Sequence, residues 1–218
     1  MDTPAPAPEE GPTVADITDY VTSILTLRYD VNERVIYLMG GIDDDQARQF
    51  IILLNFLDNI AKEPIRILLS SDGGSEEAGY AIYDAIKLAR NPVLIDGIGM
   101  VASMAAVILQ AGDVRRLSQN SVYMIHHGSM SMPDHVEQDK VMAISRLIET
   151  NNVKYHTLMA NRTGLAMAEI CKMSEEETYL SAGDAVRKGF ADYLWLPPRK
   201  KNTKKLLSRW VAGYQDKK

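Results

Sequence analysis

The 218-residue sequence contains one cysteine, Cys171, and no uninterrupted apolar run of about 18 residues, the length that a transmembrane helix requires. One cysteine excludes a disulfide within the chain and is compatible with a reducing compartment. The first residues, MDTPAPAPEEGP, lack the basic start and apolar stretch of a secretory signal. The sequence therefore predicts neither a membrane-spanning protein nor a disulfide-stabilised one.

Metal, nucleotide and nucleic-acid sites also lack their usual signatures. The four histidines show no H-x-x-x-H spacing and no Cys/His set suited to zinc. No Lys and Ser/Thr follow the glycine pair 73–74 in Walker order, which disfavours a phosphate-binding loop. The net charge of −5 argues against a nucleic-acid binder, because affinity for phosphates needs a cationic face. No internal repeat is present.

From about Ile24 the sequence alternates between strand and helix patterns. Strands are expected at 34–40, 65–71, 92–99 and 120–127, and the apolar run at 65–71 is typical of a strand buried on both faces. Helices are expected between them, at 43–63, 75–90 and 103–112. This repetition of strand–helix units predicts an α/β fold in one domain.

The rhythm changes after the fourth strand. Residues 133–164 predict one helix of roughly 25 residues, closed by Gly164, that projects from the globule because no strand partners it. His135 and His156 on this helix are expected to be solvated. A short helix at 165–173 is expected to bury Cys171, and Ser181 with Asp184 fits the start of a last helix.

The segment VLIDGIGMVASMAAVILQAG (93–112) places one hydroxyl, Ser103, where an apolar strand turns into a small-residue helix. The first N–H groups of a helix lack helical partners and can stabilise an anion. An exposed hydroxyl beside such amides is the arrangement of a nucleophile elbow. The G-x-S-x-G form is absent, however, and a plain N-cap role for Ser103 is an equally open interpretation.

Glycines and histidines supply further candidates. Gly73 and Gly74 follow a buried strand, where their N–H groups could line an anion site, although a tight turn is the favoured interpretation. His126 and His127 end a strand, so alternation sends them to opposite faces, and one could serve as a general base near the serine. Spacing alone does not choose an acidic partner among Glu175, Glu176, Glu177 and Asp184.

Four motifs taken together resemble the Clp protease proteolytic subunit (ClpP) family over about residues 24–194. They are DGGSEEAGYAIYDAI, GMVASMAA, MIHHG and LSAGDAVRKGFAD, in this order. Each is weak alone, but four in the right order with similar gaps are specific. The resemblance implies a ClpP/crotonase-like spiral of repeated strand–strand–helix units, and a serine-type endopeptidase that works through an acyl-enzyme.

The resemblance also implies residue roles. Ser103 matches the nucleophile and His126 the general base, while Gly74 and Met104 match the donors of the oxyanion hole. The family's acid is an aspartate shortly before LSA, and this position holds Glu177 here.

Two departures from the family pattern leave questions open. Because glutamate is longer than aspartate, Glu176 and Asp184 remain alternatives to Glu177 as the acid. The segment after His126 reads HGSMSMPD, where the family has a proline and a glycine pair, so substrate binding or contacts between rings could differ.

The resemblance further implies a division of the chain and a set of partners. A leader or axial segment is expected at 1–20, a peptidase domain at 21–195 with a handle helix at about 134–161, and a basic tail at 196–218. The partners would be further copies in two stacked seven-membered rings, an AAA+ unfoldase and unfolded polypeptides. ATP would be used by the unfoldase, and this subunit would need no cofactor or metal.

The implied location is the cytoplasm, or the stroma of a plastid or other organelle, with no nucleic-acid or membrane partner. Two alternatives compete with an active peptidase. One is a catalytically silent subunit of the same ring, supported by Glu177 and the altered segment after His126. The other is a crotonase-like acyl-CoA enzyme, which would use the glycine loop but no serine nucleophile.

Overall fold

The computed structural model describes residues 29–128 and 138–196. The expected leader, His135, the segment between Gly128 and the long helix, and all of the basic tail except Leu196 lie outside these ranges.

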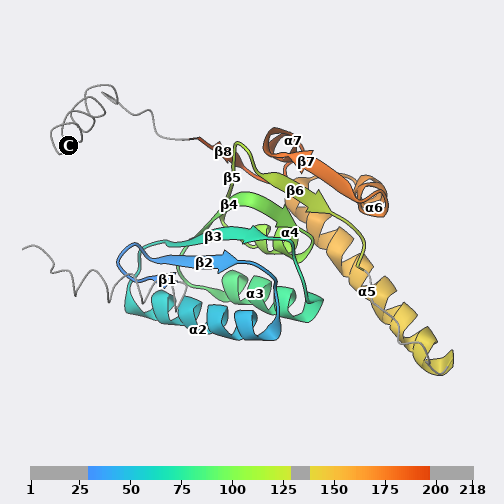
Figure 1. Cartoon of the computed structure of the whole chain (residues 1–218), viewed down its shortest axis with the longest axis horizontal. Coiled ribbons are helices and arrows are strands. Elements are labelled where there is room, and N and C mark those ends of the chain that lie inside the picture. Colours follow the sequence, from blue (N-terminus) through green and yellow to red (C-terminus); the bar gives the residue numbers. More distant parts are fainter. Residues whose placement is uncertain (1–28, 129–137, 197–218) are drawn as a thin grey trace, which may run out of the picture.

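A mixed sheet forms the centre of the described part of the chain (Figure 1). Its eight strands run in the order β1-β2-β3-β4-β5-β8, while β6 pairs with β4 and β7 pairs with β6. The β1–β2 and β6–β7 pairs are antiparallel and the others are parallel. The strands are β1 (Tyr29–Asp30), β2 (Val35–Met39), β3 (Ile65–Ser71), β4 (Val93–Ala102), β5 (Val114–Ser118), β6 (Val122–Ile125), β7 (Thr178–Ser181) and β8 (Tyr193–Trp195).

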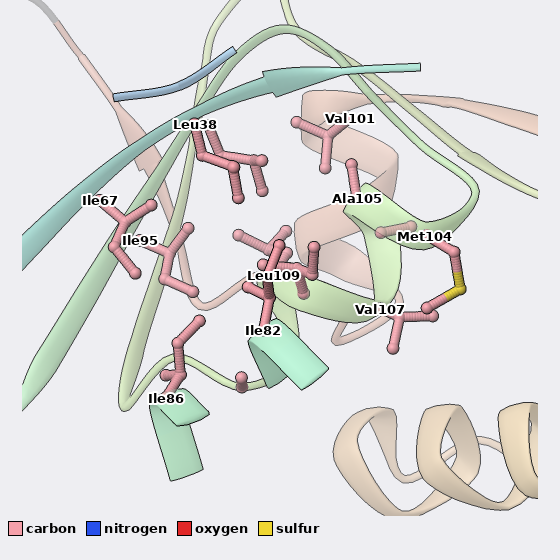
Figure 2. Packing of buried hydrophobic residues seen from close by; sticks show 14 of the residues in the cluster. Leu38, Ile67, Ile82, Ile86, Ile95, Val101, Met104, Ala105, Val107 and Leu109 are labelled. Carbon is pink, nitrogen blue, oxygen red and sulfur yellow. The ribbon is translucent and has the colours of Figure 1, made fainter. Parts of the chain in front are cut away.

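Helices α2, α3 and α4 lie together on one side of the sheet, whereas α5 extends away from it (Figure 1). Buried aliphatic side chains of β2, β3 and β4 meet those of α3 and α4 in the core, as Figure 2 shows for Leu38, Ile67, Ile95, Ile82 and Leu109. The helices are α2 (Asp44–Ile60), α3 (Glu76–Leu88), α4 (Met104–Leu109), α5 (Gln138–Thr163), α6 (Met167–Glu175) and α7 (Ala182–Arg187).

The predicted α/β alternation is confirmed, and the helices begin where the sequence indicated. The side chain of Asp43 accepts a hydrogen bond from the Gln46 N–H at 2.8 Å and caps α2. Ser181 caps α7 in the same way through the N–H of Asp184, as predicted. Strand β3 differs in one respect, since fully buried residues alternate with half-buried ones instead of being buried on both faces.

Strand β4 positions the candidate site, because its first half pairs with one strand and its second half pairs with another. Residues 94–97 pair with β5, and residues 100–102 pair with β6 after the chain passes Gly99, whose φ is +62°. Glycine adopts this left-handed conformation without steric cost. The fork brings the end of β4 beside the end of β6.

Four strands were not predicted, namely β1, β5, β7 and β8. Strand β5 reads VRRLS, and its two arginines conceal the apolar alternation. Both arginines have carboxylate partners, because Arg115 pairs with Asp192 and Arg116 pairs with Asp96, each at 2.5 Å. Such pairing makes charged residues tolerable inside a sheet, but it depends on residues distant in sequence.

The long helix α5 ends at Thr163, and Gly164 follows it with a φ of +78°, as the closing glycine was expected to do. Its first half bears exposed apolar side chains, including Met142 and Leu147, whereas Tyr155 and Met159 near its end are buried. The predicted projecting helix is thus present, anchored by its C-terminal third.

Candidate active site

Ser103 occupies a sharp turn between β4 and α4. Its backbone has φ 55° and ψ −121°, an unusual conformation for a residue other than glycine. Its N–H donates to the Met124 carbonyl of β6 at 3.0 Å, and its own carbonyl accepts from Ala106 at the start of α4. The side chain makes no capping hydrogen bond to the helix. The N-cap interpretation therefore does not account for this hydroxyl.

His126 follows β6 directly and faces this serine. Ala102 pairs with Met124 in the β4–β6 register, so the residues just beyond each strand end lie together. The distance between His126 Nε2 and Ser103 Oγ is 2.8 Å, which is a hydrogen bond. The sheet fork thus brings together two residues that are 23 positions apart in sequence.

The two glycines after β3 lie against the serine turn. A Cβ on Gly73 would fall 2.6 Å from Ser103 Cβ, so no side chain fits there. Gly74 has a φ of +152°. On either side of it, the Gly73 carbonyl accepts from the Ile42 N–H and the Ser75 N–H donates to the Ile42 carbonyl. Neither the Gly74 N–H nor the Met104 N–H has a backbone acceptor among the described residues. Both residues line the cavity in front of Ser103.

This cavity has a volume of about 330 Å³. Its walls combine apolar surface with carboxylates and two tyrosines. Burial, with a contribution from the nearby Glu76 carboxylate, raises the pKa of Tyr80 to about 12, so this phenol stays neutral near physiological pH. The lining residues are Asp72, Gly74, Glu76, Tyr80, Ser103, Met104, Met124, His126, Gly128, Asn152 and Tyr155.

A family model described as Clp protease matches residues 20–196. The chain belongs to the Clp protease family.

Curated relatives and a solved structure agree with this assignment. The chain is 31% identical over 162 residues to the ATP-dependent Clp protease proteolytic subunit 2 of Treponema denticola, covering 73% of this chain and 80% of that protein. It is 31% identical over 169 residues to the protein of the same name from Tropheryma whipplei, covering 75% and 92%. A ClpP1 point mutant from Listeria monocytogenes superposes with a TM-score of 0.72 at 26% identity, covering 80% of this chain and 96% of that one.

The predicted ClpP-like fold class is therefore confirmed, and membership of the Clp protease family supports a peptidase activity. No helix in the described ranges is long and apolar enough to span a membrane. Within the same ranges, no three His, Cys, Asp or Glu residues are grouped to hold a metal ion.

Within this Clp protease, Glu177 has the expected backbone position but a different side-chain contact. Thr178 pairs with Ile125 in the antiparallel β6–β7 register, and one further step would set Glu177 opposite His126. Instead, Glu177 has a φ of +49°, and its carboxylate accepts the Tyr179 hydroxyl at 2.8 Å. The role of Glu177 as the third catalytic residue stays a prediction.

The two alternative acids are also engaged elsewhere. Glu176 lies 3.8 Å from the Lys172 ammonium, and Asp184 accepts from Ser181 and pairs with Arg187. In the described part of the chain, no carboxylate is hydrogen-bonded to His126. The structure thus brings the predicted serine and histidine together, and among the described residues no acid is bonded to that histidine.

The second histidine of the MIHH motif points away from the serine, as the alternation predicted. The His127 ring lies 5.0 Å from that of His156 on α5, and His156 Nδ1 is 3.3 Å from Cys171 Sγ. The prediction that His156 is solvated is wrong, because its exposed fraction is 6%. Its neighbours Tyr155 and Met159 share the helix stripe that packs on the core, a helical spacing that could have revealed this burial. Cys171 is half-buried rather than fully in the core.

Proposed function

We propose that this Clp protease subunit is a serine endopeptidase that hydrolyses unfolded polypeptides. The observation that carries the proposal is the 2.8 Å contact between Ser103 Oγ and His126 Nε2. It lies beside a cavity of about 330 Å³ lined by Gly74 and Met104, whose N–H groups have no backbone acceptor among the described residues. A nucleophile, a base within hydrogen-bonding reach and an anion-binding pair of amides are the parts that acyl transfer requires.

The chemistry follows from this arrangement. Neutral His126 accepts the Ser103 proton at Nε2 while Oγ attacks the peptide carbonyl. The N–H groups of Gly74 and Met104 stabilise the resulting oxyanion. His126 then donates its proton to the leaving amine, and water repeats the sequence to release the acyl group and restore Ser103.

The remaining parts of the proposal concern the assembly. Copies of this chain would stack as two seven-membered rings through α5, whose exposed Met142 and Leu147 provide apolar contact surface. An AAA+ unfoldase would use ATP to feed unfolded chains into the chamber, in the cytoplasm or an organelle stroma. No cofactor takes part in the hydrolytic steps described above.

A catalytically silent ring subunit is the second candidate. It is favoured by one observation, the Glu177 carboxylate held by Tyr179 with no acid bonded to His126. In that case Ser103 would lack an activated base, although the ring could still assemble.

A fluorophosphonate probe and a fluorogenic peptide separate the two candidates. The assembled wild-type protein is expected to be labelled at Ser103 and to cleave the peptide, whereas Ser103→Ala should do neither and keep its native mass. Ser118→Ala is a matched control, because this serine ends β5, outside both the cavity lining and α5. Absence of both labelling and cleavage in the assembled wild type would favour the silent subunit.

A further inference from the structure

We propose that Glu76 makes this peptidase select substrates with a lysine or arginine side chain on the residue whose carbonyl is attacked. The inference rests on the proposed function, since it names the substrate class of the same site. Glu76 is the first residue of α3 and lines the cavity that also contains Ser103 and His126. A carboxylate in the wall of a substrate pocket provides a fixed negative charge for a cationic side chain.

The Glu76 carboxylate is held in place by neighbouring elements. Its Oε2 accepts a hydrogen bond from Asn151 Nδ2 of α5 at 2.7 Å. Its Oε1 lies close to Gly128, because a Cβ built on that glycine would be 2.2 Å from this oxygen. The Gly128 N–H in turn donates to Asn152 Oδ1 at 3.1 Å. The carboxylate is therefore fixed between α3, α5 and the residue two positions after His126.

One carboxylate oxygen of Glu76 has unused hydrogen-bonding capacity within the described residues. Oε1 has no hydrogen-bond donor among the residues that the structure describes. An ammonium or guanidinium group carries several donors and would satisfy this acceptor.

The charge of the cavity favours the same class of ligand. Asp72 adds a second carboxylate to its lining, and no lysine or arginine belongs to that lining within the described residues. The Lys154 ammonium lies 3.5 Å from the Tyr80 ring centre, and no ion pair joins it to Glu76 among the described residues. Within residues 29–128 and 138–196, no cation is thus paired with the Glu76 carboxylate.

The apolar part of the wall completes the match. Met104 and Met124 line the cavity together with the Tyr80 ring. Lysine and arginine have long aliphatic stems that pack along such surface while the charged end reaches a polar group. A long cationic side chain therefore fits a cavity wall that combines methionines with a carboxylate.

The test compares fluorogenic peptides that differ only at the residue before the scissile bond. Norleucine has the same four-carbon stem as lysine and lacks only the terminal ammonium group. With the assembled wild-type protein, kcat/KM is expected to be about tenfold higher for the lysine peptide, the size of effect typical of one charge-assisted hydrogen bond. Equal or faster cleavage of the norleucine peptide by wild type would overturn the inference while leaving the proposed peptidase intact.

Substitutions then assign the preference to Glu76. Glu76→Gln keeps the shape of the side chain and removes its charge, and it should reduce the lysine-to-norleucine ratio towards one. Glu77→Gln removes the same charge from the next residue, which is exposed and lies outside the cavity lining, and it should keep the ratio. A ratio that survives Glu76→Gln would also overturn the inference. Absence of cleavage of either peptide by wild type, together with no phosphonate labelling, would overturn the proposed function itself.

Discussion

Tyr179 donates its hydroxyl to the carboxylate of Glu177 at 2.8 Å on an exposed part of β7. This hydrogen bond engages the carboxylate with Tyr179, although the β6–β7 register carries the Glu177 backbone towards His126. The same contact raises the pKa of Tyr179, because ionisation of the phenol would place two negative charges together. We expect this bond to compete with any contact between Glu177 and His126.

Tyr179→Phe tests this competition directly. Loss of the hydroxyl frees Glu177 to approach His126, and kcat/KM for peptide cleavage is expected to rise by up to about tenfold, the range of one hydrogen bond. Tyr193→Phe removes a hydroxyl from another exposed tyrosine, on β8, and should leave the rate unchanged. A fall in rate for Tyr179→Phe alone would mean that the tyrosine holds Glu177 in its productive position.

Alanine substitutions compare the contributions of His126 and Glu177 to the rate of peptide cleavage. His126→Ala removes the proposed base and should lower kcat by at least about 100-fold. Glu177→Ala should lower it less, because an orienting carboxylate acts through the imidazole rather than on the substrate. Steady-state kinetics on assembled protein gives both values. An equal or larger loss for Glu177→Ala would make this carboxylate indispensable.

A substitution at Gly73 tests whether its close packing against the Ser103 turn matters for peptide cleavage. Alanine at Gly73 would bring its Cβ within 2.6 Å of Ser103 Cβ and 3.0 Å of the Met104 nitrogen, at a φ of +101°. We expect Gly73→Ala to lower kcat/KM by about 100-fold or more, because small displacements of reacting groups have effects of this size. Gly41→Ala is the control, since nothing lies within 4 Å of its added Cβ. Comparable losses in both variants would show that the close approach at Gly73 is not what matters.

The features of the fold and site that the sequence predicted are those encoded in short contiguous segments. The Ser103 turn and the His126 strand end are encoded in short contiguous patterns, and parallel strands bring such ends to one edge of the sheet. The direction of the Glu177 side chain depends on Tyr179, and the strand character of Arg116 depends on Asp96, twenty residues earlier. No periodicity in the sequence reports such pairings between specific side chains.

The ion pairs of Asp96 with two arginines are expected to contribute to the stability of the fold. It is fully buried and accepts from Arg66 Nε and Arg116 Nε, each at 2.5 Å, while both guanidinium groups lie against the Trp195 ring. Asp96→Ala leaves two partly exposed cations without their partner, and should lower the free energy of unfolding by about 2–3 kcal/mol. Asp45→Ala removes an exposed partner of Arg48 and should cost at most about 1 kcal/mol. Urea denaturation measures both, and similar losses would refute a special role for the buried cluster.

His156 gives the stability a pH dependence whose sign can be worked out. Burial, with the neighbouring His127 adding to it and Glu175 opposing it, lowers the pKa of His156 below its ordinary value. The folded protein therefore holds fewer protons at this site than the unfolded chain once the pH falls to about 6.5, the ordinary imidazole pKa. The contribution of neutral His156 is complete above that pH and is lost as the pH falls through the lowered pKa. Urea midpoints at pH 7 and pH 5 should thus differ less in His156→Gln than in wild type. The comparison is made at constant ionic strength, and an unchanged difference would assign the acid sensitivity to other groups.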